Sequence, residues 1–376
     1  MKIGILTFHH SLNYGAMLQA YCLQTYLQSS GHSVEFLDYN PAYLEQGGTF
    51  KSLLKVRLTR SYLKSLYLFY SSVICGLKYK YLASQFADFR STCLNIGDTC
   101  FLSSSDFDFK NDLYDLIVIG SDQVWNPSDQ YGLDSIYFGD PLYKISQRII
   151  SYAASFGSIN RISPYLNVLP SLLRRFDDLS VRECSAQQFL SNLSIKSTLV
   201  PDPTFLVDDL GAFSKVSSHI PNDKKYGFFY VLRDAFNMHK FADSLVSDKN
   251  LDAIFSAATP WRRWKPLGVE VELSPFEFIG AIQYSEFTIS NSFHGIVTSI
   301  LTSTNFIAVK LPGSKSGLSS RISDLLECLG LSSRLVPAHS LCDSMDLLSS
   351  PINWSDVKNK VHNMRSFGQS YLNRNI

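Results

Sequence analysis

A histidine stands at the start of an expected helix in the second half of the sequence. Residues 287–289 have the apolar content of a buried strand, and Ser290-Asn291-Ser292 follows them, with His294 and Gly295 next. Serine and asparagine favour helix starts, and a helix N-terminus attracts carboxylate or phosphate. Histidine can carry a proton near neutral pH. The pattern predicts an anion site with His294 beside it, and a buried structural histidine is the alternative.

A second group of polar residues follows the apolar run 116–120. Asp122, Gln123 and Asn126 offer hydrogen bonds suited to sugar hydroxyls, and Trp125 offers a flat face for a pyranose ring. Ligands of open α/β sheets bind beyond the carboxyl ends of the strands. We therefore expect a saccharide site here. The alternative is that Asp122 caps a helix and Trp125 belongs to the core.

Polar residues and a glycine also follow the first expected strand, residues 3–8. Asn13 and Gly15 open the helix predicted for residues 16–27. Glycine lets backbone approach a ligand, and the helix start offers free N–H groups. An ordinary turn between strand and helix is an equally good interpretation of this segment alone.

Metal ligands are not expected from the sequence. His9-His10 is expected to have no nearby carboxylate or cysteine, and Asp106-Phe107-Asp108, which mimics a metal-binding D-x-D, lies in a polar, serine-rich stretch. Common nucleotide-binding and hydrolase motifs are absent. The sequence predicts no metal and no cofactor.

These groups need a scaffold of parallel sheets. Short apolar strands alternate with helical patterns along most of the 376 residues, which indicates the doubly wound α/β class. Breaks between Pro201 and Asp223 suggest a Rossmann-like domain over residues 1–205 and another over 206–350. A last helix in 351–376 would cross back to the first. Two such domains facing across a cleft resemble the GT-B arrangement of glycosyltransferases.

Composition narrows the class of protein. The net charge of +1 gives no basic excess for nucleic acid, and the seven scattered cysteines form no zinc-ribbon spacing. The first residues lack the pattern of a secretory leader, and no apolar run approaches the ~18 residues of a membrane span. We expect a cytoplasmic protein.

The segment 46–87 departs from the alternation. It contains no Asp or Glu but seven basic residues interleaved with aromatic and aliphatic ones. Such a helical insertion suits an anionic membrane surface at the inner face of the membrane. A basic helix packed on its own domain is the equally weighted alternative.

Six motifs, in order, resemble the polysaccharide pyruvyl transferase family. They are Asn13-Tyr14-Gly15-Ala16 with Leu18-Gln19-Ala20-Tyr21, Gly120-Ser121-Asp122-Gln123-Val124-Trp125-Asn126, Tyr152-Ala153-Ala154-Ser155-Phe156-Gly157, Ser180-Val181-Arg182-Glu183, Asp202-Pro203-Thr204 and Asn291-Ser292-Phe293-His294-Gly295, with Ser319-Ser320-Arg321-Ile322 as a looser match. They extend over about residues 10–325, and the segment 46–87 lies outside them.

The resemblance implies transfer of the enolpyruvyl unit of phosphoenolpyruvate onto two hydroxyls of a sugar in a surface polysaccharide or its precursor, with a pyruvate ketal and phosphate as products. His294 is then the proton carrier. Residues assigned to the donor are Ser290, Asn291, Ser292, Gly295, Arg321 and Arg233. Those assigned to the saccharide acceptor are Asn13, Gly15, Asp122, Gln123, Trp125, Arg182 and Glu183. In one version of the hypothesis this acceptor is lipid-linked.

Two other classes compete with this interpretation. A GT-B glycosyltransferase would place the pyrophosphate of a nucleotide sugar at the same helix N-terminus. A non-catalytic member of the family would keep only the fold, but the presence of both His294 and Arg321 argues against that class.

Overall fold

The computed structural model describes residues 1–41, 80–107, 113–127, 130, 132–233, 238–259, 266–311 and 320–376. Most of the segment 46–87, which carries the predicted membrane contact, lies outside these ranges. Within the described residues, no helix is long and apolar enough to cross a membrane.

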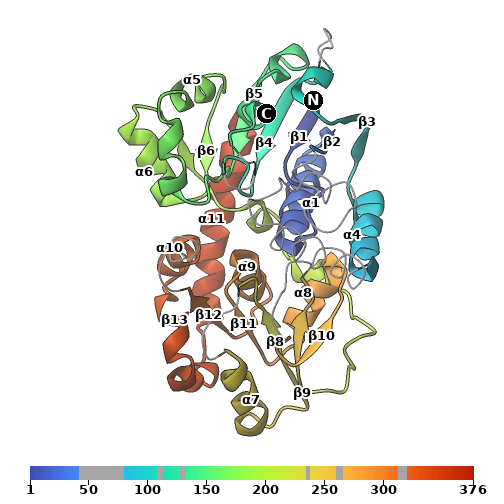
Figure 1. Cartoon of the computed structure of the whole chain (residues 1–376), viewed down its shortest axis with the longest axis vertical. Coiled ribbons are helices and arrows are strands. Elements are labelled where there is room, and N and C mark those ends of the chain that lie inside the picture. The colour runs from blue at the N-terminus through green and yellow to red at the C-terminus, as the bar shows by residue number, and fades with distance from the viewer. Residues whose placement is uncertain are drawn as a thin grey trace, which may run out of the picture.

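The first domain is built on a parallel sheet of five strands in the order β3-β2-β1-β4-β5. Its central strands consist almost entirely of buried aliphatic residues, as expected where helices cover both faces. A parallel pair, β6 and β7, extends this domain beside β5 (Figure 1). The strands are β1 (Lys2–Leu6), β2 (Ser33–Tyr39), β3 (Ile96–Phe101), β4 (Leu116–Gly120), β5 (Ile149–Tyr152), β6 (Ser180–Val181) and β7 (Thr198–Leu199).

The second domain contains a parallel sheet of six strands in the order β10-β9-β8-β11-β12-β13. In each sheet the chain first adds strands on one side of its first strand, β1 or β8, and then on the other side. This reversal of strand order is the doubly wound topology. The strands are β8 (Tyr226–Tyr230), β9 (Ala253–Ala257), β10 (Val269–Val271), β11 (Phe287–Ser290), β12 (Phe306–Lys310) and β13 (Leu335–Pro337). The predicted pair of Rossmann-like domains is confirmed.

Helices cover the faces of both sheets (Figure 1). Those of the first domain are α1 (Tyr14–Ser29), α4 (Lys80–Cys93), α5 (Leu169–Leu173) and α6 (Cys184–Asn192). Those of the second are α7 (Met238–Asp248), α8 (Pro275–Gln283), α9 (Phe293–Leu301) and α10 (Ser320–Leu329). The short 3-10 helix η6 (Pro203–Phe205) begins the connection between the domains.

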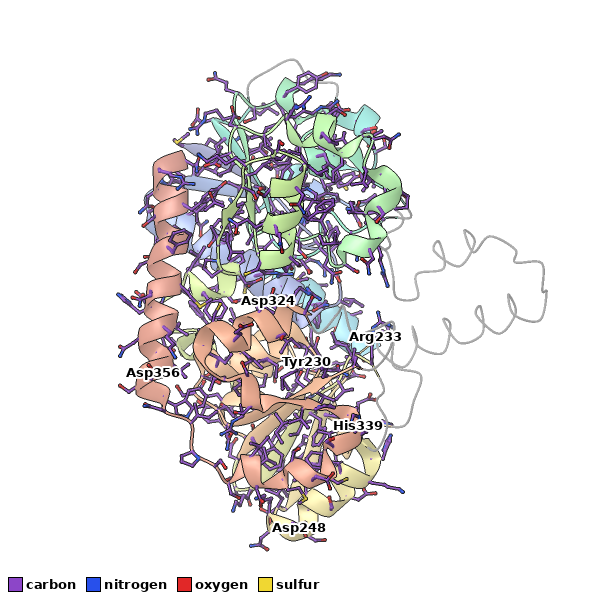
Figure 2. All side chains as sticks on the ribbon, turned by 90° about the vertical axis from the view of Figure 1, so that its left-hand side faces the viewer. Tyr230, Arg233, Asp248, Asp324, His339 and Asp356 are labelled. Carbon is purple, nitrogen blue, oxygen red and sulfur yellow. The ribbon has the colours of Figure 1, made fainter. Side chains whose placement is uncertain are left out.

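The last helix, α11 (Trp354–Asn375), runs along both domains, as Figure 2 shows. Its start packs against the second domain through Val357 and Val361. Its end reaches the first domain, where the Tyr371 hydroxyl donates to the Ser151 carbonyl at 2.9 Å and Asn375 Nδ2 donates to Asp178 at 3.0 Å. The chain therefore returns to its first domain at the end.

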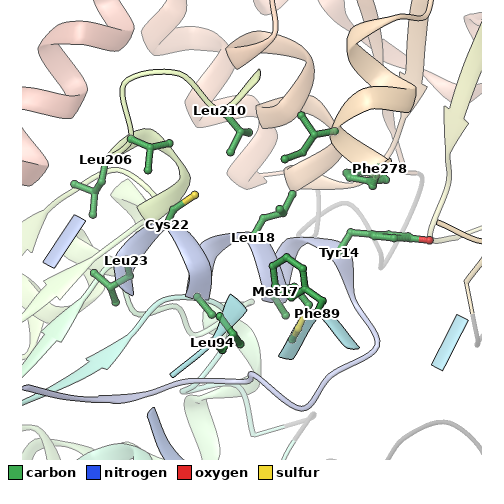
Figure 3. Packing of buried hydrophobic residues seen from close by; sticks show 14 of the residues in the cluster. Tyr14, Met17, Leu18, Cys22, Leu23, Phe89, Leu94, Leu206, Leu210 and Phe278 are labelled. Carbon is green, nitrogen blue, oxygen red and sulfur yellow. The ribbon is translucent and has the colours of Figure 1, made fainter. Parts of the chain in front are cut away.

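Helix α1 is buried on both sides, and it joins the two domains (Figure 3). Leu18 and Cys22 belong to one continuous apolar cluster that includes Leu206 and Phe278. The Tyr14 ring stacks on Phe278, with ring centroids 4.4 Å apart and planes inclined by 8°. The domains therefore meet through a shared core around α1.

Candidate active site

Asp202 is the centre of a buried polar cluster between the two domains. Its side chain is completely buried at the start of η6, where Oδ1 accepts hydrogen bonds from the backbone N–H and hydroxyl of Thr204. The other oxygen, Oδ2, accepts from Arg182 Nη1 at 2.6 Å and from the Ser121 hydroxyl at 3.1 Å. His294 Nε2 lies 3.4 Å from the same oxygen. Residues that follow four different strands thus meet on one carboxylate.

Charge explains why this carboxylate is ionised although it is buried. Burial alone would raise the pKa of Asp202, but His294 and Arg182 hold it well below its usual range. The Arg182 guanidinium is also buried, and its Nε lies 3.4 Å from Glu183 Oε1, which accepts a 2.7 Å hydrogen bond from the Ser155 hydroxyl. Two carboxylates, Asp202 and Glu183, thus face one guanidinium.

The sequence correctly places His294 in the first turn of α9, directly after β11. Its ring lies over Gly15 at the start of α1: a methyl group on Gly15 would overlap Nδ1 and Cγ of the ring and come within 2.7 Å of the His294 Cβ. Gly15 therefore lets the two helix starts approach each other. Its expected role was close backbone approach to a ligand, whereas the group that it admits is the imidazole.

A cavity of about 530 Å³ opens beside this cluster. Two arginines from different domains lie at its wall on the ring of Phe293, with Arg182 Cζ 4.8 Å and Arg321 Cζ 5.8 Å from the ring centroid. The Arg182 Nη2 is buried without a hydrogen-bond partner in the part of the chain described. Glu183 and Asp324 bring carboxylates to the same cavity. Burial, with the charges of Glu183 and Glu327, raises the pKa of Asp324.

The polar residues before α9 have mostly structural contacts. The Ser290 hydroxyl donates to the Tyr230 carbonyl at 2.6 Å and accepts from the backbone N–H of Ser292 at 3.0 Å. Asn291 accepts from the Leu232 N–H and donates to the Arg233 carbonyl, at 2.9 and 2.6 Å. These side chains hold the ends of β8 and β11 together. The predicted donor contacts of Ser290 and Asn291 would compete with these bonds.

The remaining residues assigned to the donor differ in whether they can reach a ligand in the cavity. Ser292 begins α9 without a capping hydrogen bond from its side chain, so the first-turn N–H groups of the helix are not capped by that hydroxyl. Gly295 packs closely on Ser290 and Tyr230. Arg321 lines the cavity, whereas Arg233 is exposed at the end of β8 (Figure 2).

The prediction for Trp125 is wrong. Its ring is fully buried against Phe138 and Phe156, and its Nε1 donates to the Tyr137 carbonyl at 2.7 Å. Because no face of the ring reaches solvent, Trp125 cannot stack on a sugar. It belongs to the core of the first domain, which is the alternative considered above.

The other expected acceptor residues lie at the ends of β1, β4 and β6. Asn13 caps α1 by accepting from the Gly15 N–H at 2.9 Å. Asp122, half-buried after β4, has a φ of 65°, a backbone conformation that is uncommon outside glycine. Gln123 accepts from Asn126 at 2.8 Å. Arg182 and Glu183, also assigned to the acceptor, instead join the cluster around Asp202 and His294.

The expectation about His9 and His10 rested on a wrong premise. Asp38, at the end of β2, brings a carboxylate to both rings: its Oδ1 lies 2.5 Å from His10 Nε2 and 3.5 Å from His9 Nε2. By contrast, Asp106 Oδ2 accepts from the backbone N–H groups of Leu102 and Ser103, which identifies a loop cap, and Asp108 lies outside the described residues.

Sequence reasoning did not assign Asp202, Ser121, Ser155 or Phe293 to the site. All four are within the motifs that carried the resemblance, but Asp202 was interpreted as part of a linker because prolines flank it on both sides. An aspartate held between two prolines at the end of a strand was the available signal.

Solved structures support the architecture. At 12% identity, UDP-GlcNAc 2-epimerase from Methanocaldococcus jannaschii matches with a TM-score of 0.52 over 99% of both chains. The Neisseria meningitidis enzyme bound to UDP-GlcNAc matches at 10% identity, with a TM-score of 0.52 over 99% of both chains. A putative UDP-N-acetylglucosamine 2-epimerase from Listeria monocytogenes matches at 9% identity, with a TM-score of 0.53 over 99% of this chain and 94% of that one. These likenesses show a GT-B-like fold.

The sequence comparisons address the family. Among curated proteins, none is similar enough in sequence to count as a match. A family model for polysaccharide pyruvyl transferase matches residues 13–311, which include the strand ends that form the Asp202 cluster. Part of the wall of the cavity beside it, including Arg321 and Asp324, lies beyond the matched residues. On this match over most of its length, the chain belongs to the polysaccharide pyruvyl transferase family.

Proposed function

We propose that this transferase moves the enolpyruvyl unit of phosphoenolpyruvate onto a sugar of a surface polysaccharide or its precursor, forming a pyruvate ketal. The observation that carries the proposal is the pair of guanidinium groups, Arg182 and Arg321, on opposite faces of the domain junction at one cavity. Its volume of about 530 Å³ suits a small ligand.

Phosphoenolpyruvate carries a carboxylate and a phosphate on one small carbon skeleton, so a site with two cations suits it. Arginine binds such anions with two parallel hydrogen bonds, which lysine cannot do. The buried Nη2 of Arg182, which has no hydrogen-bond partner among the described residues, is a donor available to such a ligand. We therefore assign Arg182 to the donor side together with Arg321, in place of the acceptor role expected from its position in the sequence.

His294 is the proposed proton carrier. Its contact with Asp202 and its position over Gly15 hold the imidazole in one orientation. The proposed acid is thus oriented by Asp202.

The reaction balances without an oxidant or reductant. A proton is added to the methylene carbon of phosphoenolpyruvate, and a sugar hydroxyl oxygen bonds to the neighbouring carbon as it loses its own proton to a base. Attack by a second hydroxyl of the sugar then closes the ketal and displaces phosphate, which leaves with the proton of that hydroxyl. Glu183 and Asp324, both at the cavity, are the candidates for the base. The cations at the site assist the departure of phosphate.

The acceptor is proposed to approach from the first domain, past Asp122 and Gln123 at the end of β4. If that saccharide is lipid-linked, the basic segment 46–87 would bring the enzyme to an anionic membrane. Sedimentation with vesicles checks this part: binding to anionic vesicles that weakens with added salt is expected, and equal binding to neutral vesicles would contradict it.

Ligand binding and turnover test the main proposal. Thermal shifts with phosphoenolpyruvate and with a panel of nucleotide sugars distinguish the two donor classes, and a shift with nucleotide sugars alone would refute ours. Phosphate release in the presence of oligosaccharide should fall at least about a hundredfold in His294→Ala, the usual cost of losing a general acid. His362→Ala, at an exposed position of α11, is the matched control.

A further inference from the structure

We propose that His9, His10 and Asp38 form a binding site for one divalent transition-metal ion, with Cys100 as the fourth ligand. His9 and His10 follow β1, Asp38 lies near the end of β2, and Cys100 lies on β3. The site therefore joins three adjacent strands at the carboxyl edge of the first sheet, and neither the family nor the proposed reaction calls for it.

The distances suit a metal ion. One ligand atom from each of His9, His10 and Asp38 lies within 4.8 Å of the other two. In a tetrahedral zinc site with bonds of about 2.0–2.1 Å, ligand atoms lie about 3.3–3.4 Å apart. His9 Nε2 and Asp38 Oδ1 are already 3.5 Å apart, whereas His10, which is half-buried, would move outward from its 2.5 Å contact with Asp38.

The orientation of His9 is the second and independent observation. Its Nδ1 lies 3.0 Å from the Thr7 carbonyl, which can only accept, so the ring proton is on Nδ1. The lone pair of Nε2 then points toward a carboxylate oxygen. Nε2 is wholly buried and has no hydrogen-bond partner within the described ranges. A histidine that donates one ring N–H to a backbone carbonyl and presents the other nitrogen is the arrangement found at metal ligands.

The alternative is an ion pair between Asp38 and a protonated His9. The His9 ring is wholly buried, so a charged imidazole there would lack solvent to stabilise it. With a neutral ring, His9 Nε2 and Asp38 Oδ1 are two acceptors 3.5 Å apart, which repel each other unless a cation lies between them. Arg90 on α4 is close enough to feel the charge of Asp38, but its buried Nη1 makes no hydrogen bond in the described part of the chain. Asp38 Oδ1 also contacts His10 Nε2, so a bound metal ion would replace that contact.

Cys100 completes the set. It is exposed, and it is the direct cross-strand partner of Asp38 in the register of β2 and β3. A bound metal ion would hold its thiol as thiolate at neutral pH. Two imidazoles, a carboxylate and a thiolate favour zinc over magnesium or calcium.

The experiment uses the full chain after dialysis against a chelator. Titration with Zn²⁺ should show one ion per chain. Co²⁺ should give the visible absorption of a tetrahedral site, together with a thiolate charge-transfer band. Loss of a residue that only contacts a metal ligand commonly costs 10–100-fold in metal affinity. Asp38 is proposed as a direct ligand, so Asp38→Asn should weaken Zn²⁺ binding by at least about 100-fold. His10→Asn, at a half-buried position, provides a second ligand variant if Asp38→Asn does not fold.

The controls are His339→Ala and Cys342→Ser, both exposed in the second domain. Each should bind zinc like the unaltered protein, whereas Cys100→Ser should lose the charge-transfer band. Absence of stoichiometric binding, or binding that Asp38→Asn and His10→Asn leave unchanged, would overturn the site. A charge-transfer band that persists in Cys100→Ser would overturn the assignment of the fourth ligand.

Discussion

Replacement of Gly15 by alanine places a methyl group against the imidazole of His294. Gly15 lies in the first turn of α1, so an alanine would have ordinary helical geometry there. The new carbon would nevertheless overlap Nδ1 and Cγ of the ring and lie 2.7 Å from the His294 Cβ. The substitution therefore tests the contact between the two helix starts, with no change in charge.

Two opposing effects set the expected free energy of unfolding. Alanine is favoured over glycine within a helix by about 1 kcal/mol. Overpacking of a close-packed site costs about 1–3 kcal/mol. Gly15→Ala should therefore destabilise the protein by up to about 2 kcal/mol. In a His294→Gly background all three overlapping atoms are gone, so the same alanine should stabilise by up to about 1 kcal/mol.

Urea denaturation of the four proteins in this double-mutant cycle measures the effect. We expect the sign of Gly15→Ala to reverse between the two backgrounds, with a coupling energy of at least about 1 kcal/mol. Turnover of Gly15→Ala should fall about a hundredfold, since a displacement of 1 Å at a reacting group can cost that much. The same sign in both backgrounds would refute the proposed contact.

Three further outcomes are expected. Asp202→Asn should lower stability at pH 7 by about 3 kcal/mol. Because the pKa of Asp202 is depressed in the folded state, its contribution to stability is present above about pH 4 and is lost as pH falls further. Denaturation should therefore show a smaller difference in stability between Asp202→Asn and the unaltered protein at about pH 3 than at about pH 7. Arg321→Ala should weaken phosphoenolpyruvate binding by about 2–5 kcal/mol in calorimetry, whereas exposed Arg174→Ala should not. Trp125→Phe should lower stability by about 1–3 kcal/mol through the lost hydrogen bond but keep normal turnover per folded molecule, and a selective loss of acceptor binding would restore its discarded sugar-binding role.

Apolar periodicity predicted the buried strands of both sheets, because central strands of parallel sheets are continuous aliphatic runs. It did not predict β3, β10 or β13. These strands lie at sheet edges, and β3 has the sequence Ile-Gly-Asp-Thr-Cys-Phe, with three exposed residues in its middle. Edge strands are covered on fewer sides, so their sequences carry little of the apolar signal. Missing β3 also concealed the cysteine opposite Asp38.

The position of the site was predictable, but the pairing of its residues was not. Strand ends pointed to Asp122, Arg182 and His294, since topology brings the carboxyl ends of parallel strands to one edge. Which residues share a contact depends on how the second domain is placed on the first. That placement puts Asp202 between Arg182 and His294, residues 112 apart in the sequence.

The shared core around α1 makes a wide opening of the two domains costly. Tyr14, Leu18 and Cys22 would each have to leave an apolar cluster that extends into the second domain, at about 25 cal/mol for every Å² exposed. Tyr371 and Asn375 at the end of α11 form a second link between the domains, through hydrogen bonds to the first. A donor that reaches Arg182 and Arg321 is therefore expected to enter through the cavity between η6, α10 and α11, whose wall includes Asn363, Met364 and Phe367. On the proposed function, the junction would be a fixed frame for the proposed acid and its two arginines, and substrate exchange would depend on side chains along α11.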